Sequence, residues 1–188
     1  MKRLLVLFIT LVFCMSGLVS CGKERMDYIS FNGTTLSLPC KVQDVLNALS
    51  GVEVNEEELA VNVNPGETYY CNFFTNFGTS FQVCNVSDTV ATVRDCEVNY
   101  ITSGVANSQQ GYEVIYPVKL EVGKEFDEKK VIKALGEPES SQTSSVGQTY
   151  IFYSNVEDIG TYIMFVTKNP EGIILSVSLT SPSSGTAE

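Results

Sequence analysis

Two amphipathic helix patterns, 86 residues apart, constrain the fold of this chain more than any other feature. In Lys41 to Leu49 the apolar residues fall at positions 42, 45, 46 and 49, the i, i+3, i+4, i+7 spacing of one helix face. The segment Val131-Ile132-Lys133-Ala134-Leu135 repeats the pattern of Val45-Leu46-Asn47-Ala48-Leu49. Asp127 can cap the second helix, and Gly136 can end it. The sequence therefore predicts one helix at a corresponding place in each half of the chain.

Strand signals follow the same order in both halves. Two alternating runs around Asn32-Gly33 predict a hairpin before the first helix, and residues 114 to 123 predict a strand before the second. After the first helix, runs rich in Tyr, Phe, Val and Thr predict three strands, at residues 68–74, 79–86 and 93–101. Two short motifs recur 81 and 82 residues later: Gly66-Glu67-Thr68-Tyr69 as Gly147-Gln148-Thr149-Tyr150, and Gly78-Thr79-Ser80-Phe81 as Gly160-Thr161-Tyr162-Ile163.

These correspondences predict an α+β fold made by tandem duplication of a β-α-β-β-β unit, with a helix packed on an antiparallel meander in two layers. We expect a first repeat at 28–103, a linker at 104–111, a second repeat at 112–182 and a flexible tail at 183–188. A unit of about 75 residues buries little surface alone, so the two sheets either pack together or continue into one larger sheet. The alternative is two unrelated α+β segments with similar turns.

The N-terminus has the features of an export signal. Lys2 and Arg3 precede an apolar run from Leu4 to Met15, which is short for a membrane span. The following Leu18-Val19-Ser20-Cys21 resembles the lipobox of bacterial lipoproteins, in which the cysteine is acylated and becomes the first mature residue. The resemblance implies a signal peptide at 1–20, a lipid such as palmitate on Cys21, a lipidated tether at 21–27, and a place on the extracytoplasmic face of the cell membrane. An ordinary secretory signal with a chance cysteine is the alternative.

The charge balance limits the classes of partner. Without Lys2 and Arg3, ten basic residues remain against 22 acidic ones, a net charge of −12. The basic residues are scattered among acids, which argues against nucleic acid as a partner. The net charge also argues against attraction to anionic lipid headgroups.

Four cysteines remain after Cys14 and Cys21 are assigned to the leader, and all four lie in the first half. Their gaps contain no Cys-x-x-Cys pair and no zinc-site spacing. Because an oxidising compartment favours disulfides, we expect two bonds, with Cys40–Cys96 and Cys71–Cys84 as the preferred pairing. Reduced, buried thiols are the alternative.

Catalytic and cofactor signals are missing. The chain has no histidine, and its 14 glycines never occur as Gly-x-Gly. Nucleophile–histidine pairs and the glycine-rich nucleotide loops are therefore excluded, and no metal or other cofactor is indicated. We expect a non-enzyme; hydrolysis by a pair of carboxylates is the alternative.

A dense aromatic segment runs from Tyr69 to Phe81. Strand alternation directs about half of its rings away from the helix, so Tyr70, Phe74 and Phe77 are a possible binding surface for protein or peptidoglycan. The alternative is that this face packs on the other repeat or on a second copy of the chain.

The whole pattern resembles known families. A tandem unit in an exported protein is similar to the fold of the β-lactamase inhibitor proteins, and a single unit is similar to small outer-membrane lipoproteins that assist barrel assembly. Leu38-Pro39-Cys40 with Arg94-Asp95-Cys96-Glu97-Val98 also resembles uncharacterised lipoproteins of clostridia-like bacteria. The expected function is a non-catalytic binding or scaffolding lipoprotein that engages another envelope protein. An inhibitor or immunity-like protein acting on an exported hydrolase is the alternative.

Overall fold

The computed structural model describes residues 23–75, 77–105, 112–157 and 159–182 of the 188-residue chain. The predicted signal peptide, Cys21, most of the predicted linker and the predicted tail at 183–188 lie outside the described residues.

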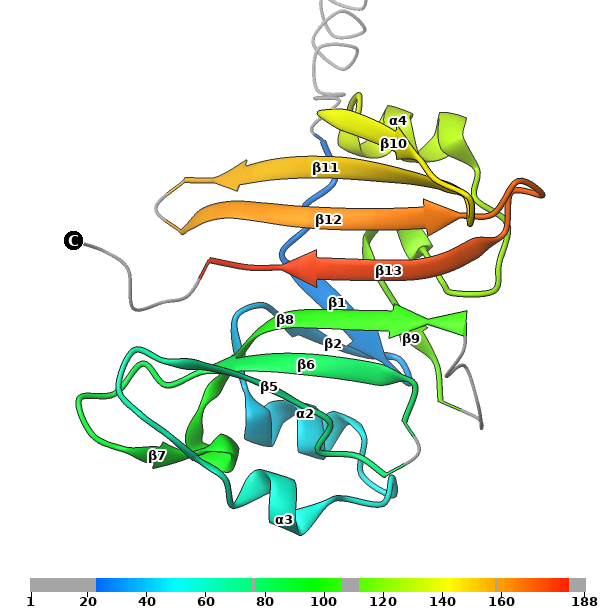
Figure 1. Cartoon of the computed structure of the whole chain (residues 1–188). Coiled ribbons are helices and arrows are strands. Elements are labelled where there is room, and N and C mark those ends of the chain that lie inside the picture. Colours follow the sequence, from blue (N-terminus) through cyan, green and yellow to red (C-terminus); the bar gives the residue numbers. More distant parts are fainter. Residues whose placement is uncertain (1–22, 76, 106–111, 158, 183–188) are drawn as a thin grey trace, which may run out of the picture.

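One antiparallel sheet of eight strands joins the two halves (Figure 1). Its order is β10-β11-β12-β13-β8-β6-β5, and β3 adds to one end of β8. The meander β11-β12-β13 of the second half meets the meander β5-β6-β8 of the first half where β13 pairs with β8. Of the two arrangements expected, the halves thus form one larger sheet. The strands are β3 Cys40–Lys41, β5 Thr68–Cys71, β6 Thr79–Cys84, β8 Glu97–Gly104, β10 Ser140–Thr143, β11 Gln148–Val156, β12 Gly160–Lys168 and β13 Ile174–Thr180.

A second layer covers one face of this sheet. The hairpin β1–β2 of the first half pairs with β9 of the second half and lies behind the large sheet in Figure 1. Helix α4 lies beside β10 at one end of the molecule, and α2 and α3 lie at the other end. The elements of this layer and its connections are β1 Tyr28–Phe31, β2 Thr34–Ser37, α2 Val42–Ala48, α3 Glu56–Leu59, β4 Asn62–Val63, β7 Ala91–Thr92, η1 Val93–Asp95, β9 Val114–Ile115, η3 Pro117–Lys119 and α4 Glu128–Leu135.

The coarse prediction is confirmed, because the protein is a mostly antiparallel α+β structure with helices on one side of the sheet. Both periodic segments form helices, α2 and α4. The Asp127 side chain accepts a hydrogen bond from the Lys130 backbone N–H at 3.0 Å, and Gly136 ends α4 with a φ of 93°. The capping residues and the helical spacing of apolar residues thus predicted the position of the second helix correctly.

Three segments differ from the prediction. Residues 93–95, expected to begin the strand 93–101, form the 3-10 turn η1, and β8 begins only at Glu97. The stretch from Val114 forms only the two-residue β9 and then the 3-10 turn η3, where Val118 has a φ of 62°. No strand was expected at residues 140–143, but they form the edge strand β10, all of whose residues are exposed. Apolar alternation predicts strands with one buried face, so it misses a strand as polar as β10.

A single hydrophobic core runs through both halves, and buried hydroxyl groups cross it. The fully buried Tyr162 of β12 donates a hydrogen bond from its hydroxyl to the Leu38 carbonyl at 2.7 Å. Ser103 Oγ lies 2.7 Å from Thr79 Oγ1 and 2.9 Å from the Tyr116 hydroxyl. The two halves therefore share packing and hydrogen bonds.

Residues 23–27, expected as part of a tether, pack against the folded domain. Met26 is 1% exposed, and the Glu24 backbone N–H donates to the Ala134 carbonyl of α4 at 2.8 Å. The Glu24 carboxylate accepts hydrogen bonds from the Tyr28 hydroxyl and from the Val118 backbone N–H. The chain thus joins the domain at the last turn of α4.

Candidate functional site

The face of the large sheet opposite the helices is the strongest candidate site, and we call it the open face. Strand pairing places its side chains in three rows that run across both halves. The first row is Tyr70, Gln82, Tyr100, Thr180, Ile163 and Tyr153. The second is Ser80, Thr102, Ser178, Phe165, Ile151 and Ser140, and the third is Gly104, Ser176, Thr167, Thr149 and Gln142. All these residues are half-buried or exposed, and no described helix or strand lies over them.

The open face carries no charged side chain in these rows, although the whole chain has a net charge of −10. Six of its members are large and apolar or aromatic: Tyr70, Tyr100, Ile151, Tyr153, Ile163 and Phe165. The others are glycine or residues with hydroxyl or amide side chains. Tyrosine-rich surfaces depleted in charge are typical of the centres of protein interfaces.

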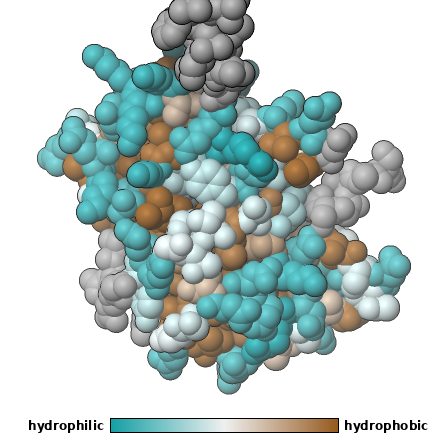
Figure 2. Space-filling view, turned by 180° about the vertical axis from the view of Figure 1, so that it is seen from behind, coloured by the Kyte–Doolittle hydropathy of each residue, from teal (hydrophilic) through white to brown (hydrophobic). Residues whose placement is uncertain are grey.

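Contacts between its side chains order the open face in advance of binding. The rings of Tyr70 and Tyr100 meet edge to face, with centroids 6.0 Å apart. Ser178 Oγ lies 2.7 Å from Thr102 Oγ1 and accepts from the Tyr100 hydroxyl at 3.3 Å. The opposite side of the molecule looks different, because hydrophobic residues there are scattered among hydrophilic ones (Figure 2). The open face is thus a broad, partly preorganised surface.

The predicted surface of Tyr70, Phe74 and Phe77 is only partly correct. Tyr70 is 66% exposed and lies on the open face. Phe74 is 3% exposed, and Phe77 is partly buried against the core. The cause is local: β5 ends at Cys71, so strand alternation does not extend to position 74. Phe73, Phe74 and Phe77 instead pack around Phe81 inside the molecule.

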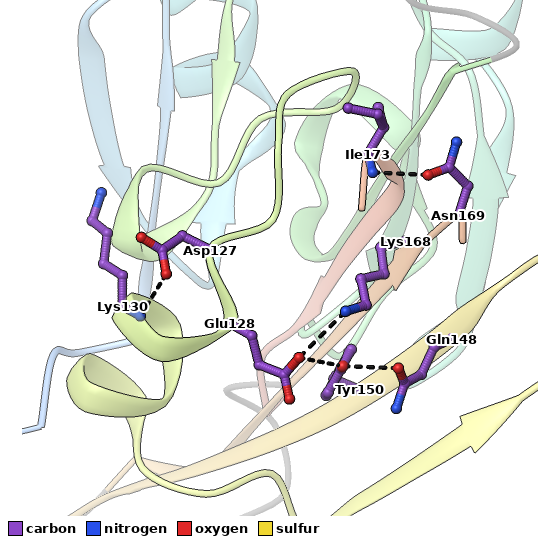
Figure 3. Close-up of polar contacts among 8 residues, drawn as sticks. All are labelled: Asp127, Glu128, Lys130, Gln148, Tyr150, Lys168, Asn169 and Ile173. Carbon is purple, nitrogen blue, oxygen red and sulfur yellow. Dashed lines mark hydrogen bonds and ion pairs between the residues drawn. The ribbon is translucent and has the colours of Figure 1, made fainter. Parts of the chain in front are cut away.

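A cluster of polar side chains, which the sequence did not indicate, joins α4 to the sheet (Figure 3). The Glu128 carboxylate accepts from the Tyr150 hydroxyl at 2.8 Å and from Lys168 Nζ at 3.3 Å. The Tyr150 hydroxyl also lies 2.9 Å from Gln148 Oε1. Lys168 Nζ sits 5.5 Å from the ring centroid of Phe126 and 5.3 Å from that of Tyr150, at cation–π distance.

The protonation states of this group indicate a structural role. The hydrogen bond from Tyr150, aided by Lys168 and opposed by burial, lowers the pKa of Glu128. Burial and the contact with Glu128 raise the pKa of Tyr150. Burial alone would lower the pKa of Lys168, but its bonds to Tyr150 and Glu128 outweigh that effect and raise it. Each shift moves the pKa of the side chain further from neutral pH, whereas a catalytic acid or base needs a pKa close to neutral.

All four described cysteines carry free thiols, so neither expected disulfide is formed in the structure. Cys71 lies opposite Phe81 and Cys84 opposite Thr68, so Cys71 and Cys84 do not face each other across β5 and β6. Cys40 lies opposite Val98 of β8, whereas Cys96 ends the 3-10 turn η1 before that strand begins. Burial raises the pKa of Cys40 and of Cys71 to about 12 and that of Cys96 to about 11. These thiols are therefore weak nucleophiles.

Two further observations concern the described part of the chain. It contains no group of three or more cysteine or carboxylate side chains arranged to hold a metal ion. None of its helices is both long and apolar enough to cross a membrane.

Comparison with known proteins adds no assignment, since the chain matches no protein-family model, no curated protein and no solved structure.

Proposed function

We propose that this protein is a lipid-anchored binding or scaffolding lipoprotein on the extracytoplasmic face of a bacterial cell membrane. It holds another envelope protein against its open face and catalyses no reaction. The main observation behind the proposal is the open face itself. Its three rows hold no charged side chain and six large ones, and no described element covers them. The lipobox-like Leu18-Val19-Ser20-Cys21 supports the anchor and the location.

The proposal of a non-enzyme is supported by the chemistry of the polar groups. The described groups with shifted pKa values move away from neutral pH, and the sequence has no histidine. The open face offers hydroxyls and aromatic rings but no charged group in its three rows that could act as a base or stabilise a developing charge.

The proposal includes an origin of the fold by tandem duplication. The meander β5-β6-β8 follows the amphipathic helix α2 and the short α3, and the meander β11-β12-β13 follows the amphipathic helix α4 and the edge strand β10. Val45 and Leu49 near α2 are buried like Val131 and Leu135 of α4, at the separation of 86 residues. In the meanders a separation of 81 pairs the buried Phe81 with the buried Tyr162. The separation of 82 suggested by the glycine motif pairs the buried Thr79 with the exposed Thr161 instead, so 81 is the better alignment.

The binding proposal is tested by capture from the solubilised envelope of the host, with residues 22–188 attached to the support by their N-terminus. The test variant is Tyr100→Thr with Phe165→Thr, which removes two rings from the open face and keeps residues suited to strands. The matched control is Val90→Thr, at an exposed residue outside the eight-stranded sheet. Circular dichroism checks that all three proteins are folded.

We expect a stoichiometric protein partner that the native chain and Val90→Thr retain equally. The double variant should retain at least about 30-fold less, the effect of removing a side chain that contributes about 2 kcal/mol to binding. A partner retained equally by all three proteins would show that the open face is not the binding surface. The activity of the captured partner, measured with and without the domain, then separates a scaffold from an inhibitor.

A further inference from the structure

The chain enters the folded domain at the end of α4. The Glu24 backbone N–H donates to the Ala134 carbonyl, and the Lys23 side chain lies over Gly136, where an added Cβ would come within 2.9 Å of Lys23 Nζ. Only Gly22 separates Lys23 from Cys21. Two residue steps of extended chain span at most about 7 Å. A lipid on Cys21 would therefore hold the end of α4 close to the membrane surface.

This end of the molecule has a distinct charge. Lys129, Lys130 and Lys133 of α4 are exposed, and none of the three is in an ion pair among the described residues. From Lys129 to Gly136 the chain has no acidic residue, but Asp127 and Glu128 precede this stretch and Glu137 and Glu139 follow it. Glu128 is paired with Lys168, and the other three acids offset much of the charge of the lysines. Helix α4 has eight residues and is about 12 Å long, so its lysines lie about one Debye length or less from the entry point of the chain.

The opposite end of the molecule is acidic. Helix α3 carries three consecutive glutamates, Glu56 to Glu58, and it lies far from α4 in Figure 1. The net charge of −12 expected for the mature chain argues against attraction of the whole domain to anionic headgroups, but it is unevenly distributed. Three lysines lie on the helix where the anchor begins, and three glutamates lie on the helix at the far end.

We propose that α4 and the segment 23–27 rest on anionic lipid headgroups, which orients the domain with α4 toward the membrane and α3 away from it. This inference rests on the proposed acylation of Cys21. The occupant of the lysine face is a lipid surface, because the length of chain before Lys23 brings that surface within reach and its charge is opposite to that of the lysines. The open face then stands beside the membrane, available to an envelope protein.

Amine footprinting tests the orientation on the full mature chain purified from its host. The acylated protein is placed in phosphatidylglycerol/phosphatidylcholine vesicles, in pure phosphatidylcholine vesicles and in detergent micelles, and is labelled with a soluble amine reagent. Mass spectrometry reads each lysine. Lys41, exposed and outside this surface, is the internal control.

Three lysines near an anionic surface favour the bound orientation by at most about 100-fold, because the flanking acids weaken the attraction. We therefore expect labelling of Lys129, Lys130 and Lys133 to fall at least tenfold on anionic vesicles relative to micelles, as an order-of-magnitude estimate, and to recover in about 1 M salt, while Lys41 stays unchanged. On pure phosphatidylcholine vesicles, which carry no net charge, the protection of the three α4 lysines should be lost.

Equal labelling of the α4 lysines in anionic vesicles and micelles, on protein whose intact mass includes the acyl chains, would overturn this inference alone. An intact mass without acyl chains would overturn the proposed anchor and this inference with it.

Discussion

The hydrogen bond from Tyr162 to Leu38 tests whether the two halves form one cooperative structure. The Tyr162 hydroxyl donates to a carbonyl 124 residues earlier in the chain, at 2.7 Å, from a ring with no exposed surface. Tyr162→Phe keeps the ring and removes the donor to a buried carbonyl. The lost bond and the unsatisfied acceptor together cost about 1–3 kcal/mol of unfolding free energy. With a urea m value of about 2 kcal/mol/M, the midpoint should fall by about 0.5–1.5 M.

Urea titration followed by circular dichroism measures this shift. Tyr70→Phe is the matched control, because its hydroxyl belongs to an exposed ring and its removal should change stability by less than about 0.5 kcal/mol. We expect a lower midpoint for Tyr162→Phe with an unchanged m value. Equal midpoints for the two variants, or a second transition in the native chain, would refute the claim that the halves share one core.

Three other predictions follow from local geometry. A Cβ at Gly147 would lie 1.9 Å from the Lys168 carbonyl oxygen, so Gly147→Ala should lower the unfolding free energy by at least about 3 kcal/mol. The control Gly66→Ala, where φ is 71° and the space is open, should cost only about 1–2 kcal/mol. Similar urea midpoints for the two variants would contradict this prediction. In residues 22–188 without reductant, iodoacetamide should label the four thiols of the folded protein slowly at pH 8, because burial raises the pKa of Cys40 and Cys71 to about 12. In urea it should label all four thiols. Fewer than four labels in urea would reveal a disulfide. Glu128 has a lowered pKa in the folded state, so its contribution to the stability of the fold is complete above its ordinary pKa of 4.5 and is lost as the pH falls below that value. Glu128→Gln should remove this part of the acid sensitivity, which is worth less than about 1 kcal/mol at this partly exposed site. Identical stability–pH curves for the native chain and the variant would show that the contact contributes nothing.

Local signals predicted the helices well but not the connections between them. The spacing of Val131 and Leu135 and the cap at Asp127 are properties of a few neighbouring residues, and both survive in the structure. Met26 stands alone in a charged segment, so no periodicity predicted that residues 23–27 would pack on the domain. The strand β10 is polar at every position and is specified by pairing with β11, which the sequence of β10 does not show.

The candidate site depends on tertiary structure even more. Alternation at Ile163 and Phe165 predicts a strand with two faces, but which face stays open depends on where β1, β2 and the helices pack. Tyr70 was predicted on a surface because it lies within a strand, whereas Phe74 lies beyond the end of that strand. The Glu128–Lys168 ion pair joins residues 40 positions apart, and no spacing rule connects them.

Photo-crosslinking in the native envelope tests the central claim most directly. A photoreactive phenylalanine replaces Tyr153 or Phe165 of the open face, or Val90 as an exposed control away from it. We predict one shared crosslinked protein from the two open-face positions and none from position 90. Crosslinks to the same protein from all three positions, or from position 90 alone, would contradict binding through the open face.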